Sequence, residues 1–231
     1  MIKLASLNDL IVYIPLRLES SRVYRKNFAL CNHKPLYTYI FDTIIELIPT
    51  KSLKNVYIDY DNSHILDLVD KKYQSYFNFF KRPDSLISES TTIIPLLNHF
   101  ISKYDLYQNH ILQTHVTNPL LSVEVIRSAF NFYCNSDCCP IFSVTEHKKR
   151  FFDINNNPLN HKIDGLVETQ SLSPLYEENS CIYIFEGNSI VRHQSRTPHG
   201  SIPFVTPYLG SIDIDDEFEL LLCDSLMKIY K

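Results

Sequence analysis

Leu10-Ile-Val-Tyr-Ile-Pro15 is the first clear apolar run of this chain, and a polar, basic segment, residues 17–34, follows it. A short apolar run of this kind, followed by polar residues, predicts a β-strand. Pro35 then opens a segment in which apolar residues recur near one helical face, which predicts a helix. A strand that leads into a helix is the start of a strand–helix–strand unit and favours an α/β fold.

The same alternation continues along the chain. Further strands are predicted at residues 56–60, 77–80, 111–115, 141–144, 181–185 and 211–215, and further helices at 64–71, 91–104, 119–133 and 216–229. Strands separated by helices indicate a mostly parallel sheet with helices on its faces. The helical period is lost at about 151–180, where we expect an inserted hairpin and loop arm rather than a second domain. Residues 1–231 are therefore predicted to form a single domain.

Composition restricts the class of protein. The 231 residues are 45% hydrophobic and 21% charged, values that are typical of a globular chain with a core. The formal net charge is −4, so we expect no nucleic-acid partner, since binding of nucleic acid relies on positive charge. No apolar run approaches the ~20 residues that span a bilayer, and the start lacks a signal-peptide pattern. We therefore expect a soluble, cytoplasmic protein without a membrane partner.

Glycine and cysteine usage excludes two kinds of site. With only four glycines, the chain cannot build a glycine-rich phosphate loop, so a phosphate site would have to use side chains. The six cysteines lack zinc-finger or zinc-ribbon spacing, and we interpret them as thiols without a metal.

A basic segment follows the first predicted strand. Its charged residues are Arg17, Arg22, Arg25, Lys26 and Lys34 against Glu19, a local net charge of +4. In open α/β sheets, ligands bind outside the carboxyl ends of the strands, and this segment lies at such an end. Arginine and lysine side chains can hold a polyanion such as a nucleoside triphosphate. The alternative is an ordinary solvated basic loop.

An acidic segment lies near the end of the chain. If residues 211–215 form a strand, Asp213 and Asp215 emerge on the same face, ~6 to 7 Å apart. Two such carboxylates can share Mg²⁺, which also takes ligands from phosphate oxygens and water. The alternative is that Asp215, Asp216 and Glu217 cap the last helix and complement its dipole.

Five blocks of sequence occur in the order in which one enzyme family carries them. They are Ile14-Pro-Leu-Arg-Leu-Glu-Ser-Ser-Arg-Val-Tyr-Arg-Lys-Asn27 with His33-Lys-Pro-Leu36, Lys81-Arg-Pro-Asp-Ser-Leu-Ile-Ser-Glu89, His115-Val-Thr-Asn-Pro-Leu120, Glu178-Asn-Ser-Cys-Ile-Tyr-Ile184 and Ile212-Asp-Ile-Asp-Asp-Glu-Phe-Glu-Leu220. In these blocks the chain resembles the acylneuraminate cytidylyltransferases, which are related to the enzymes that activate Kdo. The resemblance covers about residues 11 to 228.

The resemblance implies a Rossmann-like nucleotidyltransferase fold with a dimerisation arm, and hence a homodimer. It also implies an enzyme that couples CTP to a sugar acid of the sialic, nonulosonic or Kdo type and releases pyrophosphate. By position, the triphosphate ligands would be Arg17, Ser20, Arg22 and Lys26, the ribose ligand Asn27, the cytosine ligand Arg82, the Mg²⁺ ligands Asp213 and Asp215, and the acceptor ligands His115, Thr117, Gln170 and Tyr183. Arg17, Lys26, Asp213 and Asp215 are the predicted catalytic residues.

The chain also departs from the family pattern. Leu18 and Glu19 replace paired glycines of the sialate branch, Tyr24 replaces a proline, and His115 replaces a glutamine of the acceptor pocket. Two alternatives therefore stand beside the sugar acid: a non-sugar acceptor such as an aminoalkylphosphonate, and a nucleotide-binding module without catalytic activity.

Overall fold

The computed structural model describes residues 6–88, 90–162 and 168–229, so residues 163–167 of the predicted arm lie outside the description. It contains a seven-stranded sheet built from β1 (Ile11–Leu16), β4 (Val56–Tyr60), β5 (Asn78–Lys81), β6 (His110–Gln113), β7 (Ile141–His147), β8 (Leu175–Glu186) and β9 (Ile202–Val205). Their order is β5-β4-β1-β6-β8-β7-β9. Only β8 pairs antiparallel with its neighbours, so the predicted mostly parallel sheet is confirmed.

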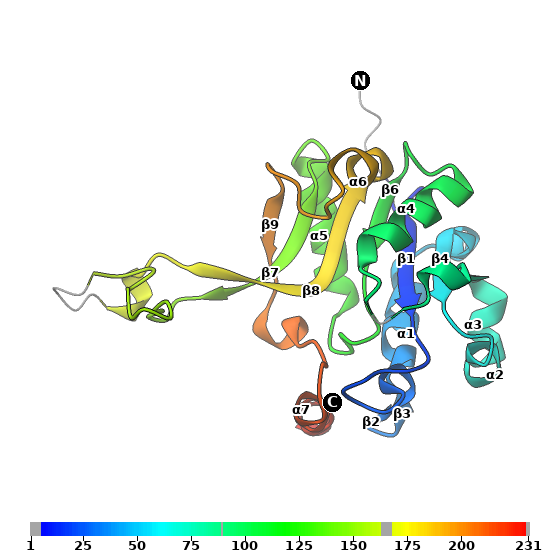
Figure 1. The fold of residues 1–231 in the computed structure, drawn as a ribbon, viewed down its shortest axis with the longest axis horizontal. Helices are drawn as coiled ribbons and strands as arrows, with labels where there is room; N and C mark the ends of the chain where they lie inside the picture. Colours follow the sequence, from blue (N-terminus) through cyan, green and yellow to red (C-terminus); the bar gives the residue numbers. More distant parts are fainter. Residues whose placement is uncertain (1–5, 89, 163–167, 230–231) are drawn as a thin grey trace.

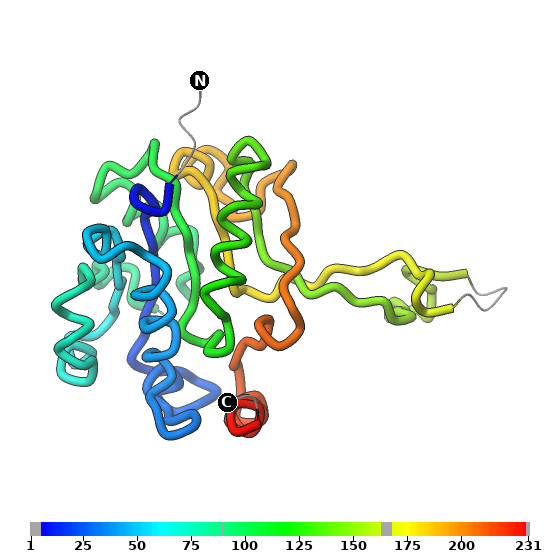
Figure 2. Tube along the Cα trace, turned by 180° about the vertical axis from the view of Figure 1, so that it is seen from behind, coloured from blue at the N-terminus to red at the C-terminus, as the bar shows by residue number. Residues whose placement is uncertain are grey.

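Helices cover both faces of this sheet (Figures 1 and 2). They are α1 (Tyr37–Leu47), α2 (Ile65–Leu68), α3 (Lys71–Tyr76), α4 (Ile93–Tyr104), α5 (Val123–Asn135), α6 (Gly187–His193) and α7 (Glu217–Ile229). Apolar side chains of α1 and α5 pack on one face and those of α4 and α6 on the other. Along β1, Val12 and Ile14 join the first cluster and Tyr13 the second, as the two-residue period of a strand requires. Within the described ranges, no helix combines the length and apolar character that crossing a bilayer needs.

The order of the strands reverses beside β1. From β1 the chain adds β4 and β5 on one side, and then returns to place β6 on the other side of β1. Loops that leave the carboxyl ends of two such strands diverge and leave a crevice between them, which is where open α/β sheets bind ligands. Arg17 follows β1 and His115 follows β6, so both predicted site residues stand at this crevice.

A third apolar cluster joins the two ends of the chain. The short strands β2 (Leu30–Cys31) and β3 (Lys34–Pro35) form a hairpin after the basic segment, and α7 packs on it. Cys31 of the hairpin, Ile214, and Met227 of α7 are buried together in this cluster. Burial of these side chains brings the acidic segment before α7 next to the basic segment after β1.

Outside the arm, two predicted elements, the strand at 211–215 and the helix at 64–71, differ from the structure. Residues 211–215 are not a strand: a 3-10 helix, Tyr208–Ser211, precedes an irregular segment, because the backbone N–H of Ile214 bonds to Thr117 O and that of Asp215 to Glu219 Oε2 rather than to a neighbouring strand. The predicted helix 64–71 is shorter in the structure: α2 ends at Leu68, and a second helix, α3, begins at Lys71. They are separated because Val69 has an extended backbone and the Asp70 carboxylate caps α3 by accepting from Lys72 N.

The predicted arm is an extension of two sheet strands. Beyond the sheet, β7 and β8 continue as a two-stranded ribbon that pairs His147 with Leu175, and the ribbon projects from the body of the protein (Figure 1). Within the predicted arm, the pairing around residues 155–157 is a single bridge between Phe152 and Pro158. There Asp153 Oδ1 accepts the N–H groups of Asn155 and Asn157 and closes a local turn.

Candidate active site

A pocket of about 650 Å³ opens at the crevice between β1 and β6. The loop after β1, the loop after β6 and the segment before α7 supply its sequence-predicted residues, and the start of α4, Ser180 of β8 and Arg196 also line it. The sequence-predicted residues among its lining are Arg17, Ser20, Arg22, Lys26, Asn27, His115, Thr117, Asp213 and Asp215. The basic and acidic segments, which the sequence places at opposite ends of the chain, thus share one pocket.

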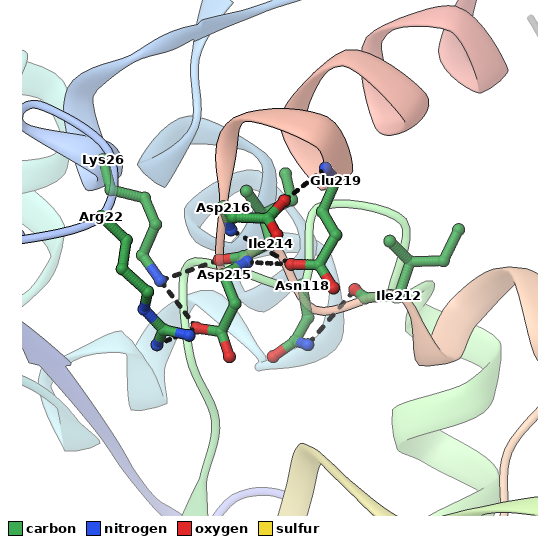
Figure 3. Close-up of polar contacts among 8 residues, drawn as sticks. All are labelled: Arg22, Lys26, Asn118, Ile212, Ile214, Asp215, Asp216 and Glu219. Atoms are coloured by element: carbon green, nitrogen blue, oxygen red, sulfur yellow. Dashed lines mark hydrogen bonds and ion pairs between the residues drawn. The ribbon is translucent and has the colours of Figure 1, made fainter.

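Asp215 joins the two segments directly (Figure 3). Its Oδ1 accepts from Arg22 Nη2 at 2.7 Å and from Lys26 Nζ at 3.1 Å, and Lys26 Nζ also donates to Ile214 O at 2.8 Å. Burial acts to raise the pKa of Asp215, but the hydrogen bonds and charges of Lys26 and Arg22 outweigh it and hold the pKa below its ordinary value. Asp215 is therefore ionised at neutral pH.

Asp213 has a different environment. Its Oδ1 is buried and has no hydrogen-bond partner among the described residues. Burial and the charge of Asp215 raise the pKa of Asp213 to about 6, although a hydrogen bond with Thr117 acts to lower it. A buried carboxylate oxygen without a partner, next to a second carboxylate, is stabilised by a cation, so the residues present fit a divalent ion.

The cap of α7 shows which of the acidic residues before this helix has a structural role. Glu219 N donates to Asp216 Oδ1 at 2.9 Å, while Glu219 Oε2 accepts from Asp216 N at 3.1 Å. This reciprocal pair is a capping box, and Asp216 is the cap of α7. Ile214 is buried, and the residues on its two sides, Asp213 and Asp215, line the pocket. The capping interpretation thus holds for Asp216, and the ligand interpretation stays open for the other two.

The loop after β1 is held without glycine. Leu18 is buried in the core, and its backbone N–H donates to Asp61 Oδ1 at 2.9 Å. Asn27 Nδ2 donates to Arg17 O at 2.8 Å and closes the loop on itself. Arg17 Nη2 donates to Thr91 O at 3.0 Å across the pocket. Of the two residues at the family's glycine positions, Leu18 is therefore packed in the core, whereas Glu19 lines the pocket.

His115 is a neutral group in this pocket. Burial, with the charges of Arg196 and Lys26, lowers the pKa of His115 to about 3. Gln113 Nε2 lies 2.7 Å from His115 Nε2, and the carbonyl oxygen of the same amide lies 3.4 Å from Arg196 Nη1. In this arrangement the Gln113 amide donates to His115, so His115 Nε2 is an acceptor and the ring proton is on Nδ1.

Three predicted ligands lie elsewhere. Arg82 is buried and bonds to Asp59 through Nε at 3.1 Å; it lines a separate cavity of about 270 Å³ that also contacts Arg17. Tyr183 is buried behind the pocket, with its hydroxyl bonded to Glu178. Gln170 is exposed on the arm and is not among the residues that line the pocket.

Arg196 is a pocket residue that none of the sequence blocks contains. It follows α6, lines the pocket, and places Cζ 3.8 Å from the centroid of the Tyr183 ring. No local pattern marks it, because α6 and β8 bring it to the site only in the folded chain.

Comparison with known proteins identifies the family. Residues 11–206 match the family described as cytidylyltransferase. The chain belongs to the cytidylyltransferase family. It is therefore a CTP-dependent nucleotidyltransferase, and the predicted enzyme class is confirmed.

Individual relatives are similar to this chain along most of its length. It is 23% identical to post-translational flagellin modification protein B of Campylobacter coli over 96% of each chain. It is 23% identical to the pseudaminic acid cytidylyltransferase of Campylobacter jejuni over 94% of this chain and 95% of that protein. Identity to the N-acylneuraminate cytidylyltransferase of Streptococcus agalactiae is 24% over 90% of this chain, which spans only 51% of that relative.

A solved structure confirms the nucleotidyltransferase fold. CMP:2-keto-3-deoxy-manno-octonic acid synthetase in complex with CTP superposes with a TM-score of 0.64 at 11% identity, covering 96% of this chain and 99% of that chain. At this identity the likeness concerns the fold alone.

Proposed function

We propose that this cytidylyltransferase couples CTP to a sugar acid of the sialic, pseudaminic or Kdo class and yields the CMP-sugar and pyrophosphate. The observation that carries the proposal is the meeting of Arg22 and Lys26 with Asp213 and Asp215 in one pocket. The names of the relatives supply the acceptor class, because those with named acceptors act on acylneuraminate or pseudaminic acid.

Chemistry at this site is a displacement on phosphorus. A hydroxyl of the acceptor attacks the α-phosphorus of CTP in line, the new P–O bond forms, and the bond to the pyrophosphate oxygen breaks. Such transfers ask the protein mainly for positioning and for stabilisation of charge. Arg17, Arg22 and Lys26 would bind the triphosphate, together with Ser20, and Asn27 would bind the ribose.

Asp213 and Asp215 would hold Mg²⁺. Among the described residues, no group of three or more His, Cys, Asp or Glu side chains is placed to bind a metal, so two carboxylates would be the protein's share. Mg²⁺ commonly takes one or two carboxylates and fills its other positions with phosphate oxygens and water. When bound, it would neutralise charge on the triphosphate.

His115 would act as a hydrogen-bonding group rather than as the base. With a pKa of about 3, its ring has little affinity for a proton at neutral pH. The departing hydroxyl proton would pass to solvent or to a phosphate oxygen. Thr117, which lines the pocket two residues later, would contact the same acceptor.

The proposal includes a homodimer. The arm presents apolar side chains to solvent: Phe152 is 55% exposed, Ile154 97% and Leu159 57%. Large apolar side chains exposed together on one projecting element favour contact with another protein. A second copy of the chain would bury these side chains and bring Gln170 toward the partner's pocket.

Turnover of a panel of acceptors tests the function. Purified protein is incubated with CTP, Mg²⁺ and N-acetylneuraminic, pseudaminic or 3-deoxy-manno-octulosonic acid, with 2-aminoethylphosphonate as the non-sugar acceptor. Pyrophosphate is measured and the product is weighed by mass spectrometry. A CMP adduct of a sugar acid supports the proposal. An adduct of the phosphonate alone, or no product from any acceptor, contradicts it.

A further inference from the structure

Arg196 lies in the pocket with an unusual set of neighbours. Its side chain is only 18% exposed, and its guanidinium stacks on the face of Tyr183, with Cζ 3.8 Å from the ring centroid. Stacking on an aromatic ring fixes the plane of a guanidinium and leaves its N–H groups available for hydrogen bonds. Arg196 is therefore a rigid, oriented cation at one wall of the pocket.

The polar contacts of Arg196 hold its guanidinium in place but do not use all of its N–H donors. Nη2 lies 3.5 Å from Glu178 Oε1, an oxygen to which the Tyr183 hydroxyl also donates, and Nη1 lies 3.4 Å from Gln113 Oε1. These two contacts are long for charged hydrogen bonds. A guanidinium has five N–H donors in a planar fork, so donors are available to a ligand in the pocket.

Arg196 shares the pocket with His115 and with the acidic pair. Gln113 bridges Arg196 to His115, and the pKa of His115 responds to Arg196, to Lys26 and to Asp215. A ligand that extends from the triphosphate site to His115 can therefore reach the guanidinium, because Gln113 contacts both side chains.

The chemistry of the acceptor supplies a matching group. In the ring form of a 2-keto sugar acid, the carbon that bears the attacking hydroxyl also bears the carboxylate. An anion therefore lies next to the reacting oxygen. The planar fork of arginine matches a carboxylate through two parallel hydrogen bonds, which lysine cannot reproduce.

We propose that Arg196 is the specificity-determining residue that binds the carboxylate of the acceptor and so selects acids over neutral sugars. The inference rests on the proposed function, and it adds the residue by which the acid is recognised. The competing role is structural: Arg196 would simply cover Tyr183 and neutralise Glu178.

Steady-state kinetics with Arg196→Gln test the inference. KM for the sugar acid preferred by the wild type is expected to rise about 10- to 100-fold, the loss typical of a hydrogen bond to a charged group, while KM for CTP changes less than about twofold. Arg196→Lys, which keeps the charge and loses the fork, is expected to recover part of the affinity. Arg192→Gln is the matched control, because Arg192 is an exposed arginine four residues earlier in α6 and outside the pocket lining.

The methyl ester of the same acid gives a readout that a structural role would not move. The wild type is expected to prefer the acid over its methyl ester, and Arg196→Gln to lose this preference. If Arg196→Gln keeps the preference, or if kcat, KM for CTP and the melting temperature all change together, the inference is wrong. If the wild-type protein turns over no sugar acid at all, the proposed function itself fails, and the inference falls with it.

Discussion

Lys26 and Asp215 are 189 residues apart in the sequence, and Lys26 Nζ donates to Asp215 Oδ1 at 3.1 Å. The contact closes the pocket between the loop after β1 and the segment before α7. It exists because Ile214 is buried with Cys31 and Met227, which anchors the acidic segment beside the hairpin. Packing of this apolar cluster thus keeps Lys26 and Asp215 next to each other.

Removal of either pocket carboxylate should abolish catalysis and leave the fold intact. Asp213→Asn and Asp215→Asn are each expected to lower kcat/KM for pyrophosphate release by 10²-fold or more, because each would remove charge from the Mg²⁺ site. Asp216→Asn is the control, since asparagine also caps helices well and Asp216 lies outside the pocket lining. Equal activity of all three variants would contradict the assignment.

Acid should inactivate the enzyme near the pKa of Asp213. That pKa is about 6, so Asp213 becomes protonated as the pH falls through 6 and loses its affinity for a cation. We expect the Mg²⁺ concentration for half-maximal rate to rise steeply between pH 7 and 5, measured at saturating CTP. In Asp216→Asn the same rise should occur. A flat profile would show that Asp213 does not bind the ion.

The same pKa makes a prediction about stability. Because the folded pKa of Asp213 is above the ordinary value of 3.8, the folded state binds more protons than the unfolded state between these values, and stability falls as the pH rises through them. Without Mg²⁺, Asp213→Asn should therefore melt at a higher temperature than the wild type at pH 7.5. At pH 4 the two should melt at similar temperatures. A destabilised variant at pH 7.5 would contradict the raised pKa.

Lys26 should matter more for CTP than its neighbour Arg25. Lys26 is 13% exposed and lines the pocket, whereas Arg25 is outside the lining and pairs with Glu19. Lys26→Gln is expected to raise KM for CTP about 10-fold or more, and Arg25→Gln by less than about twofold. Similar effects of the two variants would indicate that only overall charge counts.

The arm should control assembly. Ile154→Asp places a charge on a side chain that is 97% exposed, so the isolated subunit should keep its melting temperature. In sedimentation the wild type is expected to be a dimer, and the variant a monomer at the same concentration. Tyr76→Asp, in α3 at the opposite end of the molecule, is the control (Figure 1). A wild type that sediments as a fully active monomer would rule out the dimer.

Local sequence patterns predicted the secondary-structure elements and the basic loop that carry this site. The strand β1, helix α1 and the basic loop between them follow from apolar period and charge, and the pocket lies where the strand order reverses. The two carboxylates were also predicted, but for a partly wrong reason, since residues 211–215 are not a strand. They reach the pocket because Ile214 is buried and Asp216 alone caps α7.

What sequence could not predict depends on contacts between distant segments. Arg82 bonds to Asp59, which lies on another strand, so no local pattern shows that its guanidinium is engaged. Arg196 reaches the pocket only because it stacks on Tyr183 of β8. The predicted helix at 64–71 is interrupted where the Asp70 carboxylate caps α3. The period of apolar residues, from which the helix was predicted, contains no information on such a cap.

Calorimetric titration of CTP into the protein, with and without Mg²⁺, tests the central claim most directly. If the basic loop and the acidic pair hold one metal-bound triphosphate, Mg²⁺ should strengthen CTP binding at least 10-fold in the wild type and in Asp216→Asn. It should have little effect in Asp213→Asn. Binding of CTP that is independent of Mg²⁺ in the wild type, or equally dependent in Asp213→Asn, would contradict the claim.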